Sequence, residues 1–156
     1  MLDDKLLEYI NVAIKREEDA FRFYTELADK VTDDAARDTL FWISKEEEKH
    51  KAYLVNFRAD GKGPEDMRLA EVAYYKIAEH LEEPEVEEDM SRSEIFLVAS
   101  HRELRSYNFY SELAALYVQG DAVHEMLIKI ANEELKHKEK MEYLYANTTF
   151  PQTDGG

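Results

Sequence analysis

The sequence predicts an all-α fold, namely an antiparallel four-helix bundle of two repeated helical hairpins with a long crossover between helices two and three. Only five glycines and three prolines interrupt the 156 residues, which favours long helices. Four segments carry apolar residues at alternating spacings of three and four, the pattern of an amphipathic helix. The length is typical of one domain with its own core. The third observation is an internal repeat, described below.

Four segments carry the helical pattern: residues 3–30, 33–58, 93–118 and 121–146. The links 32–34 and 119–121 are short and contain residues that cap helix N-termini. Short links join neighbouring helices into antiparallel hairpins. We therefore expect a bundle over residues 1–146 and a flexible C-terminal tail over 147–156.

The segment 59–92 differs from the rest and is predicted to be the crossover. It opens with Gly61, Gly63 and Pro64, which end a helix, and closes with an acidic stretch around Pro84. Between them, apolar residues predict one short amphipathic helix over the bundle or against a partner: Leu69, Val72, Tyr75, Ile77 and Leu81. Because such a helix needs a surface to cover, we expect a homodimer.

The two predicted hairpins repeat each other. The sequence Phe-Tyr-Thr-Glu-Leu-Ala at 23–28 returns as Phe-Tyr-Ser-Glu-Leu-Ala at 109–114, and the same offset aligns Glu17 with Glu103. One inserted residue later, the segment Glu47 to His50 aligns with 134–137, which is again Glu-x-x-His. The two halves therefore carry the same polar residues at the same heights.

These polar residues interrupt the apolar stripes at mid-helix. A buried carboxylate costs several kcal/mol unless it is paired, protonated or bound to a metal. Glu-x-x-His places both side chains on one helix face, so that both can reach the same cation. One Glu from each of two helices and one Glu-x-x-His from each of the other two form a two-metal carboxylate pattern. The predicted ligands are Glu17, Glu47, His50, Glu103, Glu134 and His137.

Oxygen and nitrogen donors suit iron or manganese, and zinc remains an alternative because its raw affinity is higher. The chain has no cysteine, which excludes thiolate ligands and iron–sulfur clusters. Four glutamates carry four negative charges, which match two divalent cations and favour a redox pair, so two iron ions are expected. The alternative is a metal-free bundle with buried, protonated glutamates, for which the sequence gives no energetic reason.

The net charge of −15 disfavours binding to nucleic acid and to anionic membranes. The acidic N-terminus does not resemble a secretory signal, and no run reaches the ~20 apolar residues of a membrane span. We therefore expect a cytoplasmic protein. His80, His101 and His124 fall outside the stripes and are predicted to lie at the surface.

The motif Glu-x-x-small-x-x-x-Tyr, here Glu17, Ala20 and Tyr24, followed by Glu47-x-x-His50, resembles the rubrerythrin-like branch of the ferritin-like superfamily. The resemblance covers residues 5–146 and implies a non-haem di-iron site that reacts with peroxide or dioxygen. Tyr24 is similar to a family tyrosine that hydrogen-bonds a bridging glutamate, and Tyr110 is its repeat mate. Both are candidate catalytic residues, with a plain core role as the alternative.

Two departures from the family pattern matter. Classical rubrerythrins carry a rubredoxin domain with four cysteines, so this chain requires an external electron donor such as a rubredoxin-type protein. They also place an extra glutamate one turn after the third-helix ligand, where this chain has Ser106. The peroxidase mechanism of the family therefore does not transfer whole.

The resulting hypothesis is a di-iron oxidoreductase that reduces peroxide or dioxygen. Ala20 and Ser106, each one turn beyond a predicted ligand, could leave space for the oxidant, or they could serve helix packing. The alternatives are a ferroxidase that stores or delivers iron, a non-catalytic metal-binding bundle, and a substrate hydroxylase on the same scaffold.

Overall fold

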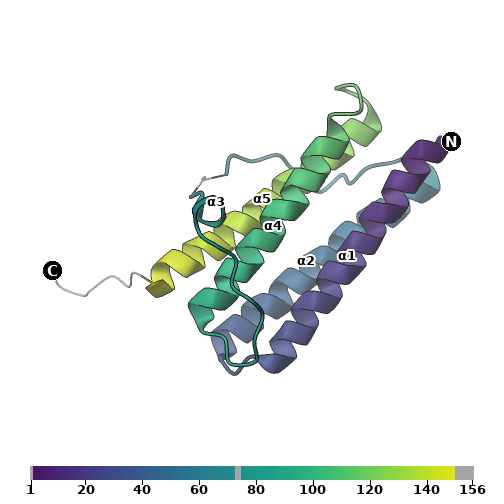
Figure 1. Cartoon of the computed structure of the whole chain (residues 1–156). Helices are drawn as coiled ribbons and strands as arrows, with labels where there is room; N and C mark the ends of the chain where they lie inside the picture. The colour runs from purple at the N-terminus through teal and green to yellow at the C-terminus, as the bar shows by residue number, and fades with distance from the viewer. Residues whose placement is uncertain (1, 73–74, 150–156) are drawn as a thin grey trace.

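The computed structural model describes residues 2–72 and 75–149, and four long helices form an antiparallel bundle in it (Figure 1). The described residues contain no strand, so the predicted all-α fold class is confirmed. The bundle helices are α1 (Asp4–Lys30), α2 (Asp34–Asp60), α4 (Arg92–Ala114) and α5 (Ala122–Thr149), and the crossover contains the single turn α3 (Ile77–His80).

Side-chain caps set the starts of three of the four bundle helices. The carboxylates of Asp3 and Asp33 each accept a backbone N–H at 2.8 Å in the first turns of α1 and α2, which satisfies donors that have no partner inside the helix. Ser91 and Glu94 form a reciprocal capping box at the start of α4. Gly61 ends α2 with a φ of 73°, a conformation in which glycine has no Cβ penalty.

Two helix ends differ from the prediction. Helix α4 ends at Ala114 rather than near residue 118, and the Nδ1 of His124 lies 2.9 Å from the Ala114 carbonyl oxygen. Helix α5 continues through Thr149, beyond the predicted end at residue 146. The rest of the predicted flexible tail, residues 150–156, lies outside the described residues.

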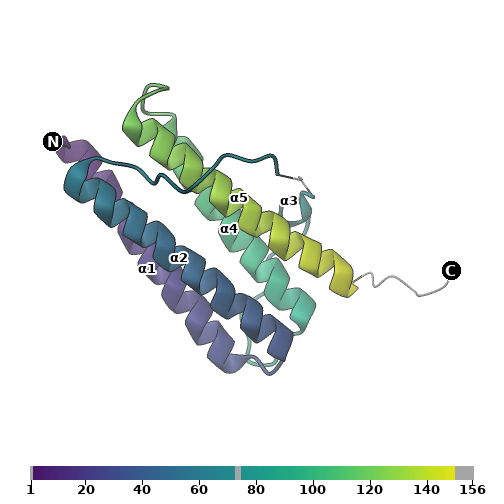
Figure 2. The ribbon, with the colours of Figure 1, turned by 180° about the vertical axis from the view of Figure 1, so that it is seen from behind.

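The helices pack most closely within each hairpin, α1 against α2 and α4 against α5 (Figure 2). Two apolar clusters fill the bundle. One contains Ile10, Phe57 and Leu127, and the other contains Leu40 and Met141. A buried layer of carboxylates and imidazoles belongs to neither cluster, and the stripes of all four helices contribute to it.

The prediction of one amphipathic helix through 69–81 was wrong. Residues 69–72 and 75–76 are not helical, and only Ile77–His80 forms a turn. The amide of Asn132 on α5 both accepts from the backbone N–H of Ala70, at 3.1 Å, and donates to its carbonyl oxygen, at 3.0 Å. Because Asn132 already satisfies the N–H and C=O of Ala70, a helix at this residue would have to replace these bonds. Leu69 is 56% exposed.

A buried ion pair fastens α3 to α5. The Glu142 carboxylate accepts the backbone N–H groups of Ile77 and Ala78 at 2.6 and 2.9 Å. The ammonium of Lys138 contacts Glu142 and also Glu79, the latter at 2.8 Å. The crossover is thus held by specific polar contacts rather than by an apolar helix face.

Within the described parts of the chain, no helix combines the length and the apolar character needed to cross a membrane.

Candidate metal centre

The six predicted metal ligands lie together in the polar layer between the two apolar clusters. Helices α1 and α4 each contribute a glutamate, and α2 and α5 each contribute a glutamate and a histidine one turn further on. All six residues are 3% exposed or less: Glu17, Glu47, His50, Glu103, Glu134 and His137. The matching heights read from the repeat are therefore correct.

These residues form two overlapping groups. Donor atoms of Glu17 and His50 gather with one oxygen each of Glu47 and Glu134, all within 4.8 Å of one another. A second group has the same two shared glutamates with Glu103 and His137 in place of Glu17 and His50. Two ion positions that share two carboxylates are the arrangement of a bridged two-metal site.

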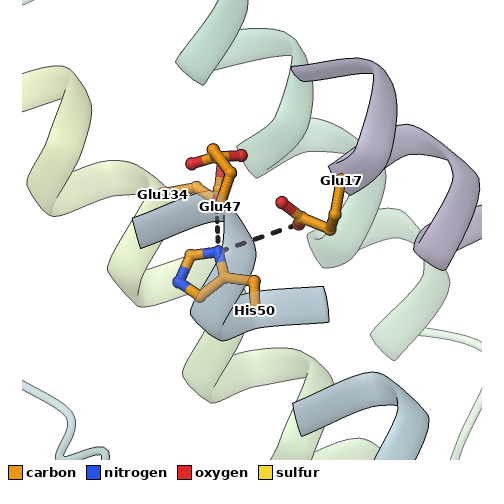
Figure 3. Close-up of side chains that lie close together, drawn as sticks. All are labelled: Glu17, Glu47, His50 and Glu134. Atoms are coloured by element: carbon orange, nitrogen blue, oxygen red, sulfur yellow. Dashed lines mark ion pairs between the residues drawn. The ribbon is translucent and has the colours of Figure 1, made fainter. Parts of the chain in front are cut away.

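The contacts cross between the hairpins. His50 Nδ1 on α2 lies 2.6 Å from an oxygen of Glu134 on α5 and 3.7 Å from an oxygen of Glu17 on α1 (Figure 3). His137 Nδ1 lies 3.5 Å from Glu47 and 3.6 Å from Glu103. The two imidazoles stack with their ring centroids 5.5 Å apart. Each histidine therefore faces one carboxylate from its own hairpin and one from the opposite hairpin.

The fit to metal ions can be judged from the polar atoms that form no hydrogen bond. Among the described residues, every predicted ligand has at least one buried oxygen or nitrogen without a hydrogen bond, although His50 Nδ1 and Glu134 lie within ion-pair distance. Such atoms are rare in native interiors because each costs a desolvation penalty. A cluster of them that points inward, made only of carboxylate oxygens and imidazole nitrogens, fits two cations such as iron, manganese or zinc.

The carboxylates divide into two protonation types. Burial, reinforced by the neighbouring carboxylate charges, raises the pKa of Glu47 and that of Glu134 well above the usual value. Burial also opposes ionisation of Glu17 and Glu103, but their interactions with His50 and His137 outweigh it and lower both pKa values. Burial alone would lower the pKa of His50, yet the carboxylates around it raise this pKa to about 9. Cations that bind here would compete with protons for the shared pair.

The two candidate tyrosines make reciprocal hydrogen bonds across the bundle. Tyr24 on α1 donates to Glu103 on α4 at 3.0 Å, and Tyr110 on α4 donates to Glu17 on α1 at 2.5 Å. Burial, together with the charge of these carboxylates, raises the pKa of both phenols well above 10. Both side chains therefore remain neutral donors that orient the unshared glutamates.

Three hollows reach the cluster. One, of about 210 Å³, opens between α1 and α4 and ends on Glu103 and Glu47; Ala20 and Ser106 line it. Another, of about 220 Å³, ends on His50; its walls come from α2, the crossover and α5 and include acidic residues. The third, of about 600 Å³, lies between α1 and α2 and ends on Glu17 and Glu47. The space expected beside Ala20 and Ser106 is thus present.

The remaining histidines and glutamates near the motif differ in exposure. His80 is exposed, as predicted, but His101 and His124 are half-buried, and the Nε2 of His101 is enclosed without a hydrogen-bond partner. Among the glutamates that flank the ligands, Glu48 is exposed, whereas the side chains of Glu46 and Glu133 are 21% and 24% exposed. None of these residues joins either donor group.

Sequence reasoning missed the arginines of the α1–α4 hollow. Arg16 and Arg102 both line it. The signal was present, because the repeat aligns these two arginines, each directly before a predicted ligand. Their position next to a motif residue was not recognised as a sign that they would line the approach to the site.

A helical bundle whose buried centre joins four carboxylates and two imidazoles, with two shared carboxylates, has the architecture of the ferritin-like class and a centre that fits two metal ions. The rubrerythrin family model matches residues 8–145, through both hairpins, and the chain therefore belongs to the rubrerythrin family. No curated protein and no solved structure matches the chain.

Proposed function

We propose that this protein is a non-haem di-iron oxidoreductase that reduces peroxide or dioxygen and is re-reduced by an external electron donor. The observation that carries the proposal is the pair of donor groups that share Glu47 and Glu134 beside a hollow open to the surface. When bound, two iron ions would supply Lewis acidity and two electrons. The chain lacks cysteine, so electrons would come from a separate protein of the rubredoxin type.

The residues of the chain have separable tasks in this proposal. Glu17 and Glu103 would each hold one ion, with His50 and His137 as the nitrogen donors, while the shared glutamates set the spacing of the two ions. Tyr24 keeps the Glu103 carboxylate in place and lines the α1–α4 hollow. Its neutral hydroxyl therefore lies on the side from which an oxidant would reach Glu103, whereas Tyr110 lines none of the described hollows that reach the ligands.

The test is anaerobic reconstitution with ferrous iron, followed by elemental analysis and by absorbance and peroxide consumption after mixing with peroxide. We expect two iron ions per chain and turnover in the presence of a reductant. Glu17→Ala combined with Glu103→Ala should reduce turnover to the background rate. Glu48→Ala is the matched control, since Glu48 adjoins a ligand but is exposed. Unchanged turnover in the double variant would rule out the proposal.

A ferroxidase role is the second candidate, and the acidic hollow favours it. Glu46, Asp66 and Glu133 line this hollow, which ends on His50, and they would attract ferrous ions. A ferroxidase consumes ferrous iron far beyond two ions per chain and releases or stores ferric product. Counting the ferrous ions oxidised per chain therefore separates the two functions.

The expected homodimer remains a prediction. Leu69, Tyr75 and Leu81 on the crossover are each more than 40% exposed, and a second copy of the chain could cover them. Light scattering of the purified protein measures the assembly. A cage large enough for a mineral core would instead favour iron storage.

A further inference from the structure

The hollow between α1 and α4 has a basic mouth, although the protein carries a net charge of −15. Its floor is Glu47, Glu103 and the Tyr24 ring, and Ala20 and Ser106 leave room above them. Three arginines line the approach: Arg16 from α1 and Arg102 and Arg105 from α4. Peroxide and dioxygen are neutral, so the proposed reaction alone does not call for three cations at this place.

Aromatic rings hold two of these arginines in fixed orientations. The guanidinium carbon of Arg102 lies 3.8 Å from the ring centroid of Phe23 on α1, and that of Arg16 lies 4.3 Å from the ring centroid of Phe109 on α4. Each arginine therefore stacks on the opposite hairpin. Stacking occupies the face of a guanidinium and leaves the N–H groups in its plane free to donate.

The same two arginines form no direct ion pair among the described residues, although Arg102 acts at longer range on Asp19 and Glu83. Within the described residues, no carboxylate lies within 4 Å of Arg16 or Arg102, and the Nε of Arg102 is buried without a hydrogen-bond partner. Arg105 differs, because both of its terminal nitrogens donate to Glu83, at 2.7 and 2.9 Å. Two oriented guanidinium groups with free N–H donors thus lie at the opening of the hollow.

The floor of the hollow loses its negative charge when the proposed ions are present. Four carboxylates and two divalent cations together carry no net charge, so only Asp19, which also lines the hollow, remains as a lining acid outside the ligand set. Asp19 is itself paired with Lys15 at 2.6 Å. The metal-loaded hollow is then net positive and desolvated on several sides, which strengthens attraction for an anion.

We propose that this hollow binds a small monovalent anion, an inorganic oxyanion or a carboxylate, between Arg102 and the metal ligands. The N–H groups of Arg102 and Arg16 donate to the anion. A volume of about 210 Å³ admits a group of only a few non-hydrogen atoms. This inference rests on the proposed function, and it adds an anion as a co-ligand that binds beside the peroxide or dioxygen.

The first test uses azide as the probe and the cobalt-loaded protein, in which anion binding changes the visible spectrum. We expect Arg102→Gln to raise the Kd of azide by about tenfold or more, as the loss of a charge-assisted hydrogen bond predicts. Arg102→Lys should retain part of the affinity. Arg58→Gln is the control, because Arg58 is exposed and donates to Asn11, away from the hollow. Cobalt content is measured for every variant. Equal Kd values for Arg102→Gln and Arg58→Gln would overturn the proposal.

The second test is read by diffraction instead of by the spectrum of the metal, and it uses crystals of the cobalt-loaded protein. Crystals soaked in bromide are examined by anomalous diffraction, and we expect a peak within hydrogen-bond distance of the Arg102 guanidinium. If the protein takes up no cobalt, the proposed function fails, and the anion site, which needs the ions, fails with it. If it takes up two ions and the hollow holds no bromide, the anion site fails while the metal centre stands.

Discussion

The two hairpins contain the same residues at key positions, but the structure uses some of those residues in different ways. Lys51 on α2 and Lys138 on α5 are repeat mates, each one residue after a predicted histidine ligand. The Lys51 side chain is 43% exposed and pairs with Glu18 at 3.1 Å. The Lys138 side chain is 3% exposed and pairs with Glu142 and Glu79. The difference arises because the crossover covers α5 there and leaves α2 open.

The ligand layer shows the opposite behaviour. Glu17 and Glu103, like Glu47 and Glu134, occupy equivalent places in the two donor groups. The tyrosines also correspond, each donating to the unshared glutamate of the other hairpin. Residues that face the centre thus keep the symmetry of the repeat, and residues under the crossover lose it. Four predictions test this division, in order of decreasing effect.

The largest effect is expected from the shared glutamates. Glu47→Ala and Glu134→Ala should each lose both metal ions, because each residue belongs to both donor groups, whereas Glu17→Ala or Glu103→Ala should lose one. Metal per chain after dialysis is the measurement. Because the hairpins are equivalent at this layer, repeat mates should give equal results. A Glu47→Ala protein that keeps two ions would contradict the shared role.

The lysine pair should give unequal effects. Lys138→Ala leaves the buried Glu142 carboxylate without its cation and should cost about 3 kcal/mol of unfolding free energy. Lys51→Ala breaks a surface pair and should cost less than about 1 kcal/mol. Urea unfolding of the metal-free protein measures both free-energy costs. In the metal-free protein, a shift of the neighbouring histidine ligands cannot add an effect through metal binding. Similar costs for the two variants would show that the crossover does not bury Lys138 in solution.

The tyrosines should give matching, smaller effects. Tyr24→Phe and Tyr110→Phe each remove a hydrogen bond to a buried carboxylate, which is worth about 1.5 to 3 kcal/mol before any compensation. A double-mutant cycle of Tyr24→Phe with Glu103→Gln should show coupling across the hairpins, read from urea unfolding of the metal-free protein. Coupling near zero would mean that the phenol is only a packed aromatic.

The smallest effect is expected at the ion pair that joins the first hairpin turn to the start of α4. Arg92 donates to Asp33 at 2.6 and 2.9 Å, and this bond lowers the pKa of Asp33. Because the pKa of Asp33 is lower in the folded state, the ion pair stabilises the fold at pH values above the unfolded-state pKa of about 3.9. This stabilisation is lost as the pH falls through the folded-state pKa.

Arg92→Gln should therefore reduce unfolding free energy slightly at neutral pH, and the gap to the unmutated protein should close as pH drops below about 4. Denaturant unfolding at a series of pH values measures the gap. Arg58→Gln, whose partner Asn11 is neutral, should show a gap that does not vary over the same range. If the difference in unfolding free energy between Arg92→Gln and the unmutated protein grew in acid, the pKa of Asp33 would not be lowered by folding.

The sequence by itself determined the four helices, the hairpin pairing and the six residues that meet at the centre. Local periodicity carries this information, because each stripe defines the buried face of its own helix. The interruption of four stripes by Glu and His marks one common layer. The tyrosine contacts also follow once the stripes are aligned, since Tyr24 and Tyr110 lie on the same buried faces.

Only the tertiary structure decided how the crossover runs and what surrounds the centre. The amide of Asn132 bonds to Ala70, and Glu142 bonds to Ile77, over more than 60 residues of intervening chain. Such bonds leave no periodic pattern, so the apolar spacing from Leu69 to Leu81 predicted a helix that does not form. The basic mouth likewise depends on which side chains two separate helices bring together. The sequence gives the charges of these side chains, but only helix packing places them next to one another.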